Sequence, residues 1–164
     1  MSRRDSLAAG PPTPNLDPTP NLSPAEPLFD HEKLDVYQAA IAFCSWAGDL
    51  IATLPRIAAR DQLDRASTSI PLNIAEGNAK FSSADRSRFL EIARGSTVEC
   101  ASCLDVLVAR RATEASFVRP AKEQLATITR MLVGLLKRFS ARADVLREEE
   151  GPYTVEHDHE QEHE

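Results

Sequence analysis

The strongest constraint on this sequence is the spacing of its apolar residues between positions 30 and 142. The clearest run consists of Ala121, Leu125, Ile128, Leu132, Leu135 and Phe139. Steps of four and three residues put all six on one side of a helix, as in a heptad seam. Nothing in this part of the chain alternates with period two for long, as a half-buried strand would. The pattern predicts an all-α fold.

The first predicted helix carries two apolar stripes. One consists of Leu34, Tyr37, Ile41, Cys44, Gly48 and Ile51. The other consists of Val36, Ala40, Phe43, Ala47, Leu50 and Leu54. Pro55 should end this helix, because its ring disfavours helical geometry in the residue before it. A second stripe fits either a wide buried face or a contact with a neighbouring subunit, and we expect self-association.

Three further helices are predicted after Pro55. The second should begin near residues 57–60, with a kink at Pro71 and a stop at Gly77. Its buried face is predicted to consist of Leu63, Ala66, Ile70 and Ile74. The third should begin at Ser82, because Asp85 follows three residues later as in a capping box. Its stripe is predicted to consist of Phe89, Ala93, Ser96, Cys100, Cys103 and Leu107, with Ile92, Leu104 and Val108 beside it.

The fourth helix should begin within residues 114–120, where Pro120 is tolerated if it lies in the first turn. Four long helices with short connections predict an antiparallel up-down four-helix bundle over residues 30–142. Gly95 and Ser96 are expected to let two helices approach closely.

The net charge of the chain hides an uneven distribution. The 164 residues carry 19 basic and 25 acidic side chains, a formal charge of −6, which at first argues against a nucleic-acid binder. Residues 28–142 nevertheless hold 16 basic and 13 acidic side chains, whereas residues 143–164 hold 1 and 9. The body is therefore mildly basic, and the acidity belongs to the C-terminal segment.

Both ends of the sequence are predicted to be disordered tails. Seven of the 11 prolines fall within residues 1–27, so residues 1–29 should form an extended, Pro-rich segment. Its tandem hexapeptide repeat fits a docking peptide or a plain disordered extension. Residues 143–164 should stay solvated because like charges repel. Their histidines lack a rigid scaffold, so we predict no metal site.

Several functional classes have little support in the sequence. No run is apolar enough to span a bilayer, and no apolar segment of a secretory signal follows the N-terminal arginines. Three cysteines give no disulfide framework, which favours the cytoplasm. An aromatic content of 5% disfavours a base-stacking module, and no Gly-rich phosphate loop is present.

No catalytic constellation emerges either. Cys100 and Cys103 have redox-motif spacing, but they fall mid-helix on an apolar stripe, so we interpret them as core residues. His31 is the only histidine outside the acidic segment. We therefore predict no enzyme activity, no catalytic residues and no cofactor.

One polar set stands out within the predicted second and third helices. It consists of Ser69, Asn73, Glu76, Arg94 and Glu99. We expect these residues to form a buried polar network that fixes the register of the helices, and a polar ligand site is the alternative.

These segments resemble the four helix bundle protein family, also called the 23S rRNA-intervening-sequence protein or S23 family. The matching stretches are Leu34-Asp35-Val36-Tyr37, Arg65-Ala66, Ser69-Ile70-Pro71-Leu72-Asn73-Ile74-Ala75-Glu76-Gly77, Arg88-Phe89-Leu90 and Ile92-Ala93-Arg94-Gly95-Ser96, followed by Glu99. They cover about residues 30–140. The sequence departs from the family pattern at Cys103, where a larger aliphatic residue is common, and in both tails.

The resemblance implies an up-down bundle assembled as a ring-like homopentamer. Some members are encoded within intervening sequences of bacterial 23S rRNA genes. A related branch, the accessory variability protein of diversity-generating retroelements, forms a basic pentamer that binds a reverse transcriptase and nucleic acid. The family supplies no catalytic residues.

From the residues and the resemblance we expect a non-enzymatic, homo-oligomeric adaptor that associates with RNA or a nucleic-acid-handling protein and not with a membrane. The alternative is an interaction module that contacts only proteins. The expected phosphate-facing residues are Arg56, Arg60, Lys80, Arg86, Arg88, Arg110, Arg111, Lys137, Arg138 and Arg142. An ordinary solvated helix surface would explain the same residues.

Overall fold

The structure is a computed structural model that describes residues 26–149, with side chains described as far as residue 140. A short 3-10 helix η1 (Asp30–Lys33) precedes α1 (Asp35–Thr53), α2 (Ala58–Ala79), α3 (Ser83–Ala109) and α4 (Ala115–Glu149). The predicted all-α four-helix bundle is confirmed. The predictions for residues 1–25 and 150–164 lie outside the described residues.

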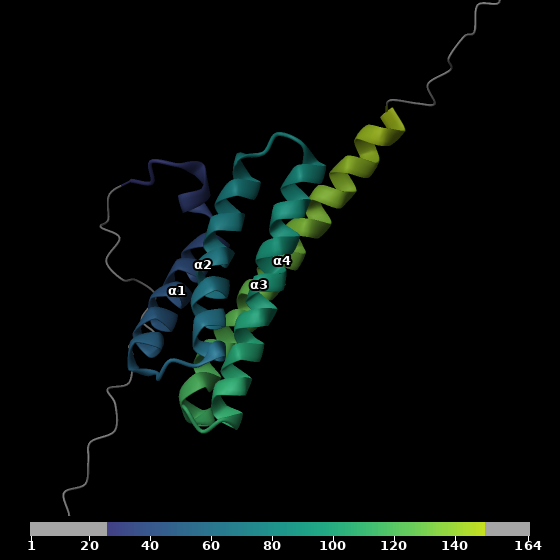
Figure 1. Cartoon of the computed structure of the whole chain (residues 1–164). Coiled ribbons are helices and arrows are strands. Elements are labelled where there is room, and N and C mark those ends of the chain that lie inside the picture. Colours follow the sequence, from purple (N-terminus) through teal and green to yellow (C-terminus); the bar gives the residue numbers. More distant parts are fainter. Residues whose placement is uncertain (1–25, 150–164) are drawn as a thin grey trace, which may run out of the picture.

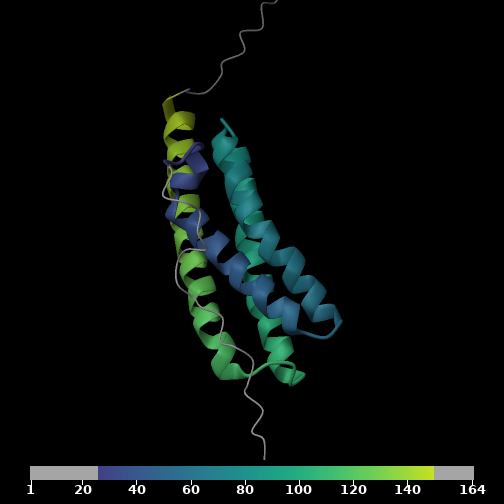
Figure 2. The same ribbon diagram turned by 90° about the vertical axis from the view of Figure 1, so that its left-hand side faces the viewer.

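The helices pack in chain order, each against the helix before it and after it, and α1 and α4 close the ring. Figure 1 shows the α1–α2 and α3–α4 connections at one end of the bundle and the α2–α3 connection at the other. In Figure 2, α1 runs obliquely between α4 and α2. Helix α4 continues to Glu149, so residues 143–149 are helical where a tail was predicted. It therefore projects past the α2–α3 connection (Figure 1).

Most helix ends follow local signals. Helix α1 ends at Thr53, just before Pro55, and Ser82 caps α3 by accepting a hydrogen bond from the Asp85 backbone N–H at 3.1 Å. Pro120 is an exception, since it lies in the sixth position of α4 instead of its first turn. There its missing N–H leaves the Ser116 carbonyl without the usual intrahelical donor.

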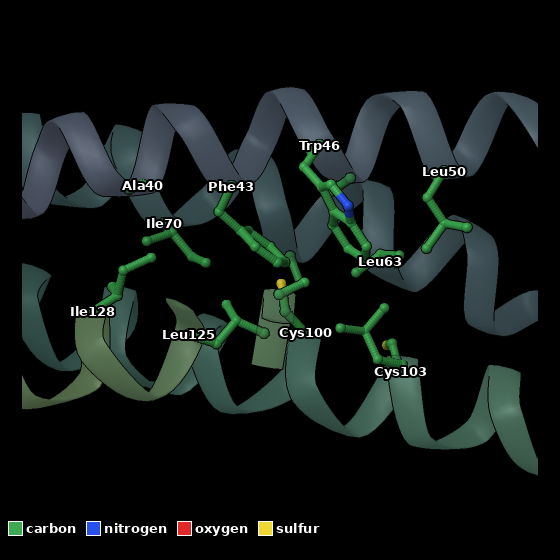
Figure 3. Close-up of a cluster of buried hydrophobic side chains, with 14 of the residues drawn as sticks. Ala40, Phe43, Trp46, Leu50, Leu63, Ile70, Cys100, Cys103, Leu125 and Ile128 are labelled. Carbon is green, nitrogen blue, oxygen red and sulfur yellow. The ribbon is translucent and has the colours of Figure 1, made fainter. Parts of the chain in front are cut away.

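The core combines one face of every helix (Figure 3). The second α1 stripe, from Val36 to Leu54, is buried throughout. The predicted α4 seam is buried from Ala121 to Leu132 and half-buried at Leu135 and Phe139. Trp46 belongs to neither predicted stripe, yet it is only 2% exposed and packs against Phe43 and Phe117 at ring-centroid distances of 5.9 Å. A large aromatic side chain thus joins α1 to the start of α4.

The first α1 stripe is only partly covered by the chain's own helices. Leu34, Tyr37, Ile41 and Cys44 are half-buried, Ile51 is buried, and Gly48 is exposed. This stripe therefore widens the buried face of α1, which was one of the two interpretations, and leaves its rim accessible.

Helices α2 and α3 approach each other closely at Gly77. A Cβ atom added there would lie 3.2 Å from the Phe89 Cβ and 3.3 Å from the Arg86 carbonyl oxygen. Gly77 was predicted to stop the helix, but α2 continues to Ala79, and Gly77 lies inside the helix at the contact with α3. Gly95 was expected to let two helices approach closely, but it is exposed with open space around it. Ile92 was expected beside the buried stripe of α3, but it is 42% exposed.

Substitution of these two glycines should have opposite effects on stability. Gly77→Ala should lower the free energy of unfolding by about 1 kcal/mol, because the α3 backbone must shift to admit the methyl group. Gly95→Ala, the matched control, should raise it by about 0.5–1 kcal/mol, since alanine favours an exposed helix interior. Urea denaturation measures both values, and a stabilised Gly77→Ala variant would contradict the close approach.

Candidate nucleic-acid interface

The predicted phosphate-facing residues divide between the two ends of the bundle. Arg56, Arg60, Arg110 and Arg111 belong to the end with the α1–α2 and α3–α4 connections, which we call the α3–α4 end. Lys80, Arg86, Arg88, Lys137 and Arg138 belong to the opposite end, which we call the α2–α3 end. Arg142 lies in α4, but its side chain is outside the described residues.

Two of these arginines serve the fold. At the α3–α4 end, the Arg60 Nε donates at 3.2 Å to the carbonyl of Ile51, which also accepts from the Leu54 N–H at the end of α1. Its Nη1 also pairs with Asp61 at 3.0 Å. At the α2–α3 end, Arg86 donates to the Lys80 carbonyl from Nε at 3.1 Å and from Nη2 at 2.7 Å. The Arg86 guanidinium is therefore held by backbone oxygens, and that of Arg60 by one backbone oxygen and the Asp61 carboxylate.

Lys80 is also engaged by its neighbours. Its Nζ lies 3.2 Å from a Glu76 carboxylate oxygen and 4.8 Å from the centre of the Phe89 ring. The ion pair is partly exposed and therefore weak, so the ammonium group can still exchange partners.

Six candidates remain exposed on the surface. They are Arg56, Arg88, Arg110, Arg111, Lys137 and Arg138. Within residues 26–140, where side chains are described, none of the six has an ion-pair partner. Each end thus presents three such cations. Because they are not neutralised within the described part of the chain, they are available to contact a polyanion.

Arg111 adopts a backbone conformation that L residues seldom adopt. Its φ is +58°, and the Ala112 N–H donates to the Leu107 carbonyl while the Arg111 N–H donates to that of Val108. This is a Schellman motif, whose left-handed position is usually glycine. An arginine there is strained, and it carries one of the six exposed cations.

Replacing Arg111 should therefore stabilise the chain. Arg111→Gly should raise the free energy of unfolding by about 1 kcal/mol, the approximate cost of the left-handed conformation for a residue with a Cβ. Arg110→Gly is the control, because Arg110 has a φ of −84° and gains nothing from glycine. Thermal or urea denaturation distinguishes them, and equal effects would refute the strain at Arg111.

The structure joins two of the five predicted network residues. The Asn73 Nδ2 donates to the Ser69 carbonyl at 2.8 Å and to the Ser69 Oγ at 3.0 Å. The Ser69 Oγ lies 2.8 Å from the Ser96 Oγ, which ties α2 to α3. Ser96 had been expected only to let the helices approach closely, but its hydroxyl is the α3 partner of Ser69. Its position on the predicted α3 stripe was the sequence feature that could have indicated this contact.

The three charged members have separate partners. Glu76 pairs with Lys80, Arg94 pairs with Glu91 at 2.7 Å, and Glu99 accepts from the Gln62 Nε2 at 2.7 Å. Arg94 cannot join Ser96, because side chains two residues apart point to nearly opposite sides of a helix. The expected single network of five is therefore wrong. The structure instead links the half-buried Ser69 and Asn73 to the buried Ser96, and the charged residues form separate pairs around them.

The cysteines lie where a core interpretation puts them. Cys100 is fully buried, Cys103 is 7% exposed, and both are free thiols, as is the half-buried Cys44. Burial raises the pKa of the Cys100 thiol far above its ordinary value. Such a thiol stays protonated and unreactive at neutral pH.

This shift gives stability a dependence on alkaline pH. The folded chain keeps the Cys100 proton, whereas the unfolded thiol ionises above a pKa of about 8.5, so ionisation favours the unfolded state as pH rises. Between pH 8 and pH 10 the wild type should lose about 2 kcal/mol from this thiol. Cys100→Ala should be less stable at pH 8, and the gap should narrow by that amount at pH 10. A constant gap would contradict the buried, protonated thiol.

Sequence reasoning missed one residue at the α2–α3 end. Phe81 is fully exposed, at 104% of its reference area, between the C-cap of α2 and the N-cap of α3. The available signal was a lone aromatic residue outside every apolar stripe and next to a predicted helix start.

The described part of the chain shows little support for a metal site or a membrane-spanning segment. Among residues 26–149, no three His, Cys, Asp or Glu side chains gather where they could hold a metal ion. None of the helices described is long and apolar enough to cross a membrane. His31 stacks on Phe29 at 5.7 Å and meets the Tyr37 ring edge-on at 4.8 Å, so it helps to anchor η1.

Comparison with known proteins gives a family and a fold. The sequence model of the family described as 23S rRNA-intervening sequence protein matches residues 32–134. A crystal structure of a protein of unknown function from the S23 ribosomal protein family of Bacteroides thetaiotaomicron is similar, with a TM-score of 0.60 and 23% identity. That similarity covers 62% of this chain and 98% of the other, and it concerns the fold. Among curated proteins, none matches this chain.

Proposed function

The chain belongs to the 23S rRNA-intervening sequence protein family, and on that premise we propose that it is a non-enzymatic, self-associating helical adaptor that binds RNA. The observation that carries the proposal is the pair of exposed cation groups, three at each end of the bundle. Phosphate contacts need cations that are not already neutralised, and these six have no ion-pair partner within residues 26–140.

Self-association would strengthen weak contacts with a polyanion. Exposed apolar side chains support it, namely Leu72 on α2 and Ile92, Val98 and Val106 on α3, which are 42–63% exposed. A closed assembly would also multiply the number of cations along one ligand. The ring of five copies follows from the family resemblance, and light scattering of the full chain tests it. A monomeric mass would contradict self-association.

The cytoplasm is the proposed compartment. Its support is that the three cysteines are free thiols, which suits a reducing environment. An adaptor that contacts only proteins is the second candidate, and the same exposed apolar residues favour it.

The salt dependence of RNA binding tests the proposal. For the wild-type chain, the logarithm of the binding constant for a short single-stranded RNA should fall linearly with the logarithm of the salt concentration. Two triple variants should each reduce this slope by up to about 2, roughly 0.7 for each lost phosphate contact. They are Arg56/Arg110/Arg111→Gln and Arg88/Lys137/Arg138→Gln. The matched control is Arg94→Gln with Arg119→Gln, since these two arginines are neutralised by Glu91 and Glu123.

Fluorescence anisotropy at several salt concentrations measures the slopes. Absence of RNA binding by the wild type, or equal losses in the control, would refute the RNA proposal and favour the protein-only adaptor.

A further inference from the structure

Phe81 is the most exposed large apolar side chain described, and it sits at the tip of the α2–α3 end. An aromatic ring fully exposed to water forgoes the favourable free energy of burial, which is proportional to the apolar area that a ligand could cover. The other exposed apolar residues lie on helix faces or near η1, whereas Phe81 stands on the connection itself (Figure 1).

The backbone on both sides of Phe81 is held firmly. The Arg86 guanidinium donates twice to the Lys80 carbonyl and lies 5.0 Å from the centre of the Phe139 ring. Ser82 caps α3 immediately after Phe81. The connection between Ala79 and Ser83 is therefore braced by α3 and α4. Presenting the ring from a braced backbone reduces the entropy lost when a ligand covers it.

Phe81 lies at an end that carries several cations. Lys80, Arg88, Lys137 and Arg138 belong to this end, as do the acidic residues Asp85, Glu76, Asp30 and Glu32, of which Glu76 is paired with Lys80 and Asp30 with Lys33. An exposed aromatic ring among cations matches the two parts of a nucleotide, a flat base and a phosphate.

We propose that the α2–α3 end binds one unpaired nucleobase of single-stranded RNA, which stacks on Phe81 while the flanking phosphates meet Arg88, Lys137 and Arg138. This inference rests on the proposed function and names its ligand and site. The bases of a duplex already stack on one another, so Phe81 should favour single strands. The 5% aromatic content argues against an extended stacking surface, and a single ring needs only one base.

The charges decide between RNA and an apolar pocket on a protein. A protein pocket that covered Phe81 would also desolvate the neighbouring cations, which is costly unless acids oppose them. A nucleotide covers the ring and supplies the negative charge at once.

The test uses the full chain and short oligoadenylate, either single-stranded or annealed to its complement. Phe81→Ala should weaken single-strand binding about tenfold, the typical loss of one stacked base, without changing the salt slope. Phe81→Trp should retain affinity, and its indole fluorescence should be quenched by the oligonucleotide in a Trp46→Phe background. Leu28→Ala is the matched control, because Leu28 is an exposed apolar residue that belongs neither to the α2–α3 connection nor to the helix faces assigned to self-association.

The possible outcomes separate this inference from the proposed function. If the wild type binds with the expected salt slope and Phe81→Ala binds equally well, the stacking site is refuted and RNA binding stands. If the wild type binds no RNA, both fail. An equal loss on the duplex, or an equal loss in Leu28→Ala, also overturns the site. Because Phe81 makes no core contact, circular dichroism should show that the variant folds normally.

Discussion

The close pairing of α2 with α3 is the constraint on which the rest of the structure depends. Three contacts occur along it at successive levels, Gln62 with Glu99, Ser69 with Ser96, and Gly77 with Phe89. Their reversed order on α3 is what antiparallel helices require. The serine contact disfavours sliding of the two helices, because Ser96 is buried and Ser69 half-buried, and a buried hydroxyl that loses its partner is costly. Gly77 then brings the backbones together just before the connection.

This pairing determines how the α2–α3 end is built. Because the helices are so close at Gly77, only a short connection is needed, and Arg86 can reach the carbonyl of Lys80. An arginine that the sequence offered as a phosphate ligand thus becomes a brace, while Arg88 one half-turn later stays exposed. Helix α4 runs beside α3 at this end, where Phe139 lies near Arg86, and it adds Lys137 and Arg138 to the same end. Charge and aromatic exposure are therefore consequences of the helix packing.

The sequence predicted the fold well where local chemistry decides. Pro55 and Ser82 mark helix boundaries through their own backbone and side-chain properties, and the α4 seam follows from spacing alone. Trp46 was missed because its burial depends on Phe117, which is distant in the sequence. Gly77 was misread for the same reason, since a helical glycine at a contact looks like a helix stop.

The candidate site was predicted less completely. Listing the basic residues could not tell which guanidinium groups satisfy backbone oxygens, because Arg60 and Arg86 find theirs across helix connections. The charged members of the polar set were likewise grouped by sequence proximity, although Arg94 and Ser96 point to different sides of α3. The two-residue spacing of Arg94 and Ser96 already indicated their different orientations. Partners across a connection are tertiary contacts that composition does not report.

Chemical-shift mapping of the full chain with single-stranded RNA tests the central claim most directly. The account predicts that the largest amide shifts fall at the two cation groups, with the greatest among residues 80–88 and 137–139 around Phe81. Shifts confined to the exposed face of α1, or no shifts at low salt, would contradict an RNA interface built on the ends of this bundle.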